Sequence, residues 1–266
     1  MHTVAVLALD KVIPFDLSTP VEVFTRTRLP GGRAAYRVRI CGATPTVDAG
    51  AFTLQPPWGL AALADADTII LPGCADPTAP IPAGVLDALR HAAASGTRIA
   101  SICSGAFILA ATGLLDGHRA TTHWLAAGAL AARHPEIAVD PDVLYVDNGQ
   151  FLTSAGAAAG LDLCLHLIRR DHGSAVAADA ARLSVMPLER EGGQAHRRFR
   201  DQTGTTPLQW LHRARIRQAQ YLLEATNNPV DRIATRVGFG SPTAFRDRFK
   251  RVVGTSPHAY RAAFRR

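Results

Sequence analysis

The sequence predicts an α/β domain, with a mostly parallel sheet sandwiched by helices, followed by a smaller all-α module. Short apolar runs alternate with helical stretches over the first 190 residues, as in sheets that are covered on both faces. The last seventy-one residues hold 15 Lys and Arg against 4 Asp and Glu, whereas residues 1–195 hold 14 against 18. The basic part contains two short amphipathic patterns around a glycine-rich break. We therefore place the domains at 1–190 and 191–266, which suits a chain of 266 residues.

Four short apolar runs predict the buried strands of the first domain. They are Val4–Leu9, Val38–Cys41, Thr68–Leu71 and Arg98–Ile102. A turn at Asn-Gly, between Val143–Asp147 and Phe151–Thr153, predicts an additional hairpin. In sheets of this kind ligands bind at the carboxyl ends of the strands, so we expect the site of this domain there.

Five stretches predict the helices that cover the sheet. They are Pro20–Arg28, Gly84–Ser95, Ser104–Thr112, Leu161–Arg170 and Ala175–Val185. Ile99–Leu115 is apolar for seventeen residues, a borderline length for a membrane span, but its β-branched start and its small residues favour a buried strand leading into a buried helix. The first apolar run lacks a basic lead and is no signal peptide. We therefore expect a cytoplasmic protein with no membrane partner.

The four cysteines, at positions 41, 74, 103 and 164, form no Cys-x-x-Cys motif and no zinc-type spacing with histidine. The spacing predicts neither a disulfide framework nor a metal site, and we expect no cofactor. Cys41 in a predicted strand and Cys164 in a predicted helix are expected to be core residues.

Cys103 lies directly between a predicted strand and a predicted helix, with Gly105 two residues later. This is the layout of a nucleophile elbow, in which the helix N-terminus and its N–H groups can stabilise an anion. The elbow predicts a reactive thiol with a lowered pKa, labelled ahead of Cys41 and Cys164. The alternative is a small buried core residue, the usual fate of a free cysteine.

The segment from Ile102 to Trp124, with Phe-Asp-Leu-Ser-Thr-Pro-Val-Glu-Val-Phe from position 15 and Ile-Leu-Pro-Gly from position 70, resembles the ThiJ/PfpI family. The resemblance spans residues 3–185 and implies a class I glutamine-amidotransferase-like fold. The nearest pattern is the isocyanide hydratase branch, which implies that Asp16 lies beside the cysteine. Ser104 stands where the peptidases of the family have histidine, so peptidase activity is not implied.

Other residues are candidates for the same site. His123 orients a ligand or, beside Trp124, is a packing residue. Asp16 is a site residue or an ordinary turn or cap residue. Gly73, after a strand, supplies an oxyanion-binding N–H or is a plain turn glycine. Glu22 on a helix face is assigned a role only weakly.

In the basic module, Ile233, Ala234 and Val237 form one apolar stripe, and Phe245 and Phe249 form a second. The break Gly-Phe-Gly-Ser ends the first helix; Ser241 can cap the next, with a proline at its first position. We expect the second helix to expose Thr243, Arg246, Arg248 and Lys250. Two helices joined by a tight turn, the second of them basic, are typical of a module that presents a helix to the major groove.

These motifs, with Gly-Thr-Thr-Pro-Leu-Gln-Trp-Leu from position 204 and Gly-Thr-Ser-Pro-His-Ala-Tyr-Arg from position 254, resemble the AraC/XylS class of bacterial transcription regulators. The class has two helix-turn-helix units joined by a long helix, here Pro207–Ala225. Residues from Phe199 resemble the end of the first recognition helix, but the two helices that should precede it are missing. Either the chain has a deletion after about Ala195 or the parent protein has residues that this sequence lacks, and only the second unit is complete. The candidate DNA contacts are Arg197, Arg200, Ser241, Thr243, Arg246, Arg248, Lys250 and Arg251.

Together the two resemblances predict a bacterial transcriptional regulator of the AraC type. Its first domain is expected to sense a ligand or oxidant or to hold a dimer together, rather than to catalyse. The implied partners are double-stranded DNA, a second copy bound through the first domain, a small-molecule effector and RNA polymerase. The rival interpretations are a cysteine-dependent hydratase or hydrolase with an incidental basic tail, and a first domain that only assembles.

Overall fold

The computed structural model describes residues 1–187 and 207–264, with side chains from 211 onward in the second range. Internal contacts divide the chain into two units, Met1–Ala195 and His196–Arg266, and each is described by itself. Among the described residues no helix is both long and apolar enough to cross a membrane.

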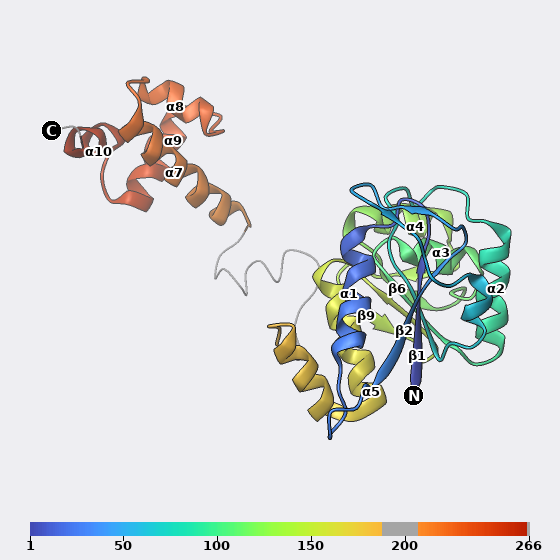
Figure 1. Ribbon diagram of the computed structural model, residues 1–266. Coiled ribbons are helices and arrows are strands. Elements are labelled where there is room, and N and C mark those ends of the chain that lie inside the picture. Colours follow the sequence, from blue (N-terminus) through green and yellow to red (C-terminus); the bar gives the residue numbers. More distant parts are fainter. Residues whose placement is uncertain (188–206, 265–266) are drawn as a thin grey trace. The chain divides into compact units, whose positions relative to one another are not determined.

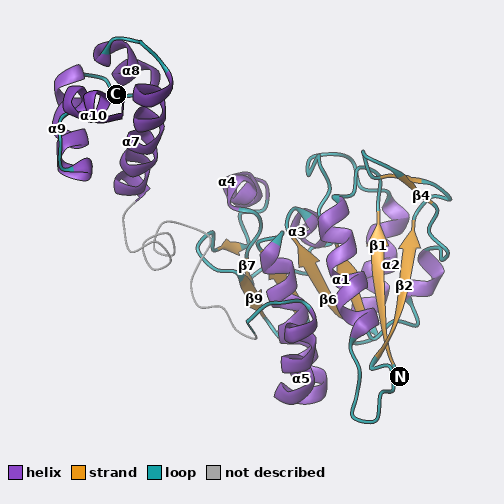
Figure 2. Cartoon of the chain, turned by 60° about the vertical axis from the view of Figure 1, so that its left-hand side comes forward, coloured by secondary structure: helices purple, strands orange, loops and turns teal. Residues whose placement is uncertain are grey.

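The first unit is built on a six-stranded sheet with the order β2-β1-β5-β6-β10-β9 (Figures 1 and 2). All neighbouring strands run parallel except β9 and β10, the predicted hairpin, so the expectation of a mostly parallel sheet is confirmed. The strands are β1 (His2–Ala8), β2 (Tyr36–Gly42), β5 (Thr68–Leu71), β6 (Arg98–Ile102), β9 (Tyr145–Asp147) and β10 (Phe151–Ser154).

Helices cover both faces of this sheet. Helices α1 (Pro14–Arg26) and α5 (Ala158–Leu183) pack against one face, and α2 (Ala83–Ala94) and α3 (Gly105–Ala111) against the other (Figure 1). Each face carries its own apolar core, which explains why the central strands are continuous apolar runs. Several short elements were not predicted: β3 (Val47–Asp48), β4 (Thr53–Leu54), the 3-10 helix Leu60–Leu63, β7 (Arg119–Ala120), α4 (Trp124–Arg133) and β8 (Ala138–Val139).

One predicted helix starts at a different residue from the one observed, and two others share a single label. Helix α1 begins at Pro14, six residues before the predicted start, and Pro20 lies inside it. Both prolines are compatible with a helix start, and the chain uses the first of them, which brings Asp16 into the first turn. The predicted helices Leu161–Arg170 and Ala175–Val185 are confirmed as two helical segments that share the label α5 and meet at Gly173, whose φ of 84° and ψ of 170° are not helical.

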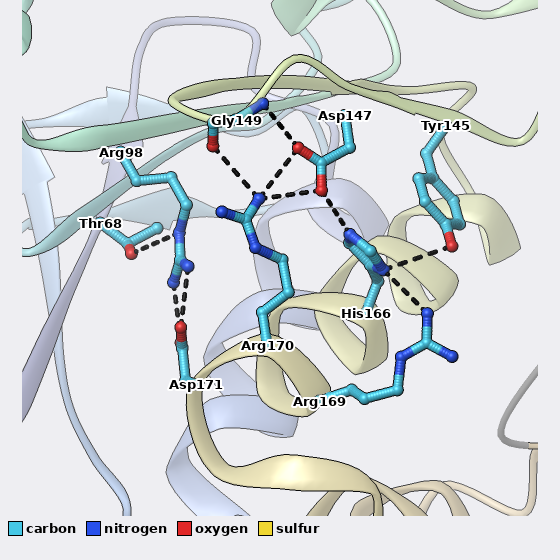
Figure 3. Close-up of polar contacts among 9 residues, drawn as sticks. All are labelled: Thr68, Arg98, Tyr145, Asp147, Gly149, His166, Arg169, Arg170 and Asp171. Carbon is cyan, nitrogen blue, oxygen red and sulfur yellow. Dashed lines mark hydrogen bonds and ion pairs between the residues drawn. The ribbon is translucent and has the colours of Figure 1, made fainter.

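A polar network ties α5 to the sheet (Figure 3). Asp171 of α5 accepts two hydrogen bonds from the Arg98 guanidinium, at 2.8 and 2.7 Å, and both side chains are largely buried. Asp147 of the hairpin accepts hydrogen bonds from His166 at 2.6 Å and from Arg170 at 2.8 Å. Arg98 is the first residue of β6, so the Arg98–Asp171 pair lies at the end of that strand opposite Cys103.

The second unit is helical, as predicted. Its helices are α7 (Pro207–Ala225), α8 (Val230–Arg236), α9 (Pro242–Val253) and α10 (Pro257–Phe264). The two apolar stripes of the sequence meet in one core, where Ile233, Phe245 and Phe249 are fully buried. Gly238 joins α8 to α9 with φ 84°, and a side chain there would lie 3.0 Å from the Arg215 guanidinium. A glycine is therefore required at this turn.

Candidate functional site

Cys103 occupies a sharp turn between β6 and α3, and its φ of 57° is in the left-handed region that non-glycine residues seldom adopt. Glycines make room for the turn. A Cβ on Gly105 would lie 2.0 Å from the Leu71 carbonyl oxygen, and one on Gly156 would lie 2.3 Å from the Cys103 Cβ. The backbone at Cys103 has the strained strand-to-helix geometry of a nucleophile elbow, as the sequence predicts.

Asp16 in the first turn of α1 lies beside this elbow. Its Oδ1 accepts a hydrogen bond from the Ala157 N–H at 3.1 Å, and the residue is 2% exposed. Its Oδ2 is buried without a hydrogen bond of good geometry from any residue that the structure describes. The Cys103 thiol and the Gly73 N–H interact with the carboxyl group and partly stabilise its charge. Asp16 and Cys103 thus form a buried carboxyl–thiol pair beside the backbone N–H groups of Ala157 and Gly73.

The prediction of a lowered thiol pKa is wrong. Burial and the nearby Asp16 carboxylate raise the pKa of Cys103 to about 12, against smaller opposing contributions from the N–H and side chain of Ser104. Burial likewise raises the pKa of Asp16. The helix N-terminus that should favour the thiolate belongs to α3, which is only seven residues long and does not offset the loss of solvent. At neutral pH the sulfur is therefore a thiol, which is a weak nucleophile.

Ser104 and Gly73 also lie at the elbow. The Ser104 hydroxyl donates to the Cys74 carbonyl at 2.7 Å and accepts from the Cys74 N–H at 2.9 Å. A Cβ on Gly73 would lie 2.6 Å from Asp16 Oδ2 and 2.9 Å from Ser104 Oγ. The Gly73 N–H lies close enough to the Asp16 carboxyl to oppose the rise in its pKa that burial causes.

His123 caps α4 through Nδ1, which accepts the Leu125 N–H at 3.3 Å. Burial raises the pKa of Asp16, and His123 lies near enough to oppose that rise slightly. Sequence reasoning missed Thr122, whose buried hydroxyl donates to the Cys103 carbonyl at 2.8 Å. Thr122 directly precedes His123, but a threonine in a loop carries no sequence signal for such a contact. Glu22 is exposed, pairs with Arg26, and takes no part in the contacts described for this site.

A pocket of about 190 Å³ opens next to the elbow. Cys74 and Ser104 lie in its wall, together with Phe107 and Ile108 of α3 and the proline-rich loop before α2. Cys103 and Asp16 do not line this pocket. Cys41 and Cys164 are fully buried, as expected of core residues, and within the described ranges no group of three or more His, Cys, Asp or Glu could hold a metal ion.

The second candidate site is the exposed face of α9. Its N-cap is Ser241, whose hydroxyl accepts the Ala244 N–H at 3.3 Å, and Pro242 is at the first position, both as predicted. Phe245 and Phe249 fix the buried side of the helix. The opposite side exposes Thr243, Asp247, Lys250 and Arg251, of which the sequence analysis missed Asp247.

Two arginines of α9, Arg246 and Arg248, interact with other helices of the unit. Arg246 is exposed as predicted, but its guanidinium forms an ion pair with Asp231 of α8. Arg248 is half-buried rather than exposed, because it follows the buried Phe245 by three residues and so lies beside the face that packs on the core. Burial lowers the pKa of the His212 ring of α7, and the nearby Arg248 lowers it further. Arg197 and Arg200 lie outside the residues that the structure describes.

Two family models match the chain. The model of the DJ-1/PfpI family matches residues 2–170, and a model described as a helix-turn-helix domain matches residues 191–263. The chain is also similar to a solved structure, an AraC family transcriptional regulator from Pseudomonas putida, with a TM-score of 0.61 at 20% identity. That match covers 69% of this chain and 100% of the other, and it bears on the fold alone.

Three curated relatives are informative. The HTH-type transcriptional regulator GlxA of Rhizobium meliloti is 30% identical, over 65% of this chain and 68% of its own length. The HTH-type transcriptional regulator GbdR of Pseudomonas aeruginosa is 27% identical over 69% of this chain. The match spans 50% of the length of GbdR. Isonitrile hydratase of Pseudomonas putida is 36% identical, over 39% of this chain and 42% of its own length.

Proposed function

Because the chain belongs to the DJ-1/PfpI family and carries an AraC-type helix-turn-helix domain, we propose that it is a sequence-specific DNA-binding transcriptional regulator. In this proposal α9 enters the major groove and the first domain controls it by sensing a small molecule and by pairing two copies of the chain. Relatives of the chain, among them GlxA, are named as HTH-type transcriptional regulators.

One observation carries the proposal. The last seventy-one residues carry a net charge of +11, and they contain α9, a capped helix whose outer face is exposed. An enzyme domain gains nothing from a basic helix held in this way, whereas DNA association depends on lysine and arginine at the phosphates. The recognition helix of such a unit reads bases with its N-terminal residues. In α9 these are the residues between Ser241 and Asp247.

The first domain acts as a sensor in this account. A thiol with a pKa of about 12 is a poor nucleophile at neutral pH, which favours a non-catalytic site. The pocket beside the elbow is the candidate effector site, since Ser104 in its wall directly follows Cys103 and is bonded to the Cys74 backbone. An effector that displaces the Cys74 loop would therefore act on the elbow through Ser104. Such an effector must bind two states of the protein with different affinities.

The alternative function is a cysteine-dependent hydratase. The observation that favours it is the strained elbow at Cys103 beside a buried carboxyl group, in a chain that is 36% identical to an isonitrile hydratase over 105 residues. Turnover of an isocyanide that is lost in Cys103→Ser would support this alternative. Regulation of DNA binding without turnover would support the sensor.

The two lysines of the chain provide a direct test of the regulator. Lys250 lies on the exposed face of α9, and Lys11 lies in the first domain, where it pairs with Asp48. Genomic DNA fragments retained by the purified full chain should share a sequence motif. Lys250→Gln should lower their affinity by roughly tenfold, because one phosphate or base contact is lost. Lys11→Gln, which removes the same charge, should leave the affinity unchanged.

Retention of no DNA by the full chain at low salt would refute the proposal. An equal loss of affinity in Lys11→Gln and Lys250→Gln would also count against it, because binding would then depend on net charge alone.

A further inference from the structure

The acidic residues of the helix-turn-helix unit are few, and their partners differ. The described range 207–264 contains Glu224, Asp231 and Asp247 among many arginines. Glu224 accepts a hydrogen bond from the Tyr260 hydroxyl at 2.6 Å, and Asp231 pairs with Arg246. Asp247 has no hydrogen-bond or ion-pair partner for its side chain among the residues that the structure describes. Two of the three carboxylates therefore stabilise the unit, and the third has no such role.

Asp247 also occupies a special position. It follows Thr243 by four residues and precedes Lys250 and Arg251 by three and four, so these side chains share the outer face of α9. Phe245 and Phe249 are fully buried on the opposite side. Asp247 lies in the first half of a twelve-residue helix, the part that approaches base edges when a recognition helix enters the groove.

A carboxylate on this face opposes DNA binding unless it gains a hydrogen bond. It repels the phosphates, and it loses water when the helix enters the groove. The donors that bases offer in the major groove are the amino groups of cytosine (N4) and adenine (N6). Adenine places the N7 acceptor beside its amino group, which repels a carboxylate, whereas cytosine has no acceptor there.

We propose that Asp247 is a specificity-determining residue that accepts a hydrogen bond from the N4 amino group of one cytosine in the operator. The inference rests on the proposed function, because it requires α9 to lie in the major groove. It assigns to Asp247 the selection of one C·G pair, and it assigns to Lys250 and Arg251 on the same face the attraction of the backbone. Arg246 forms an ion pair with Asp231, and the proposal does not need Arg246 to contact this C·G pair.

Selection of binding sites from random double-stranded DNA tests this assignment. The full chain and the variants Asp247→Ala and Asp247→Asn are compared, with Glu224→Gln as the matched control. That control removes the same charge from the same unit, and its amide oxygen can still accept from Tyr260. We expect the wild-type motif to contain a cytosine whose replacement weakens binding about fivefold or more. In Asp247→Ala this preference disappears, and in Asp247→Asn it moves toward adenine, which the amide can bind through N6 and N7.

The outcomes separate the two claims. In one outcome, Asp247→Ala and Glu224→Gln select the same motif as the wild-type chain, and each changes the affinity equally at every site. That outcome overturns the role of Asp247 and leaves the regulator intact. Enrichment of no motif by the wild-type chain overturns the regulator and the inference together. Circular dichroism of each variant shows that a lost preference does not arise from unfolding.

Discussion

At the scale of single residues, Cys103 shows what a local motif can and cannot predict. The order strand, cysteine, glycine and helix predicted the elbow, and the φ of 57° agrees with it. The direction of the pKa shift was predicted wrongly, because it depends on burial and on Asp16, which is 87 residues away in the sequence. Neither of these is visible in the motif. The position of Asp16 beside the cysteine came from family resemblance, not from the local pattern.

The Asp16 charge should slow the reaction of Cys103 with a thiol reagent. Asp16→Asn removes the carboxylate that, after burial, most raises the thiol pKa, so the labelling rate of Cys103 at pH 8 should rise several-fold. In the wild-type chain the rate should keep rising up to pH 10, without a plateau near the ordinary cysteine value of about 8.5. Mass spectrometry of the Cys103 peptide measures both rates.

Glu22→Gln is the control for this experiment. It removes the same charge from α1 at an exposed position that pairs with Arg26, and it should leave the labelling rate unchanged. A wild-type plateau below pH 8, or slower labelling in Asp16→Asn, would mean that the thiolate is stabilised, and the argument for a non-catalytic Cys103 would then be wrong.

At the scale of elements, strands were predicted better than helix boundaries. Runs such as Thr68–Leu71 and Arg98–Ile102 match β5 and β6 residue for residue, because burial on both faces leaves a continuous apolar pattern. Helix α4 was missed, although its alanines favour a helix, because only Ala127 and Leu130 are buried and the apolar period is weak. The long helix α7 agreed with the resemblance from Pro207 to Ala225.

The bend in α5 should depend on Gly173. Its φ of 84° and ψ of 170° lie in a region that is open almost only to glycine. Gly173→Ala should therefore destabilise the first domain by roughly 1–3 kcal/mol, measured by urea unfolding. The residues beyond the bend, from Val176 to Ala181, are largely buried and depend on this change of direction.

Gly128→Ala is the matched control, since Gly128 lies inside α4 and a Cβ there would meet no atom within 4 Å. That substitution should stabilise the domain by about 0.5–1 kcal/mol, because alanine loses less backbone entropy in a helix. Equal effects of the two substitutions would contradict the view that the bend is built into the sequence at Gly173.

At the scale of the whole molecule, the distribution of charge was the most informative property of the sequence. The net charge of +11 after residue 195 contrasts with −4 before it. The same boundary separates the two units of the structure. Charge segregation points to a polyanion, but it does not show which side chains point outward. For that reason Arg248 was taken as exposed and Asp247 was overlooked, since both assignments depend on how α9 packs against its neighbours.

The central claim is that the chain binds DNA through this basic unit, and the salt dependence of its affinity tests that claim most directly. Binding of the full chain to its selected site is measured by fluorescence anisotropy from 50 to 200 mM salt. Contacts with about 6 phosphates predict a slope of log K against log salt of roughly −5, and a loss of affinity on the order of 10³-fold. A slope near zero, or no binding at 50 mM salt, would contradict the account.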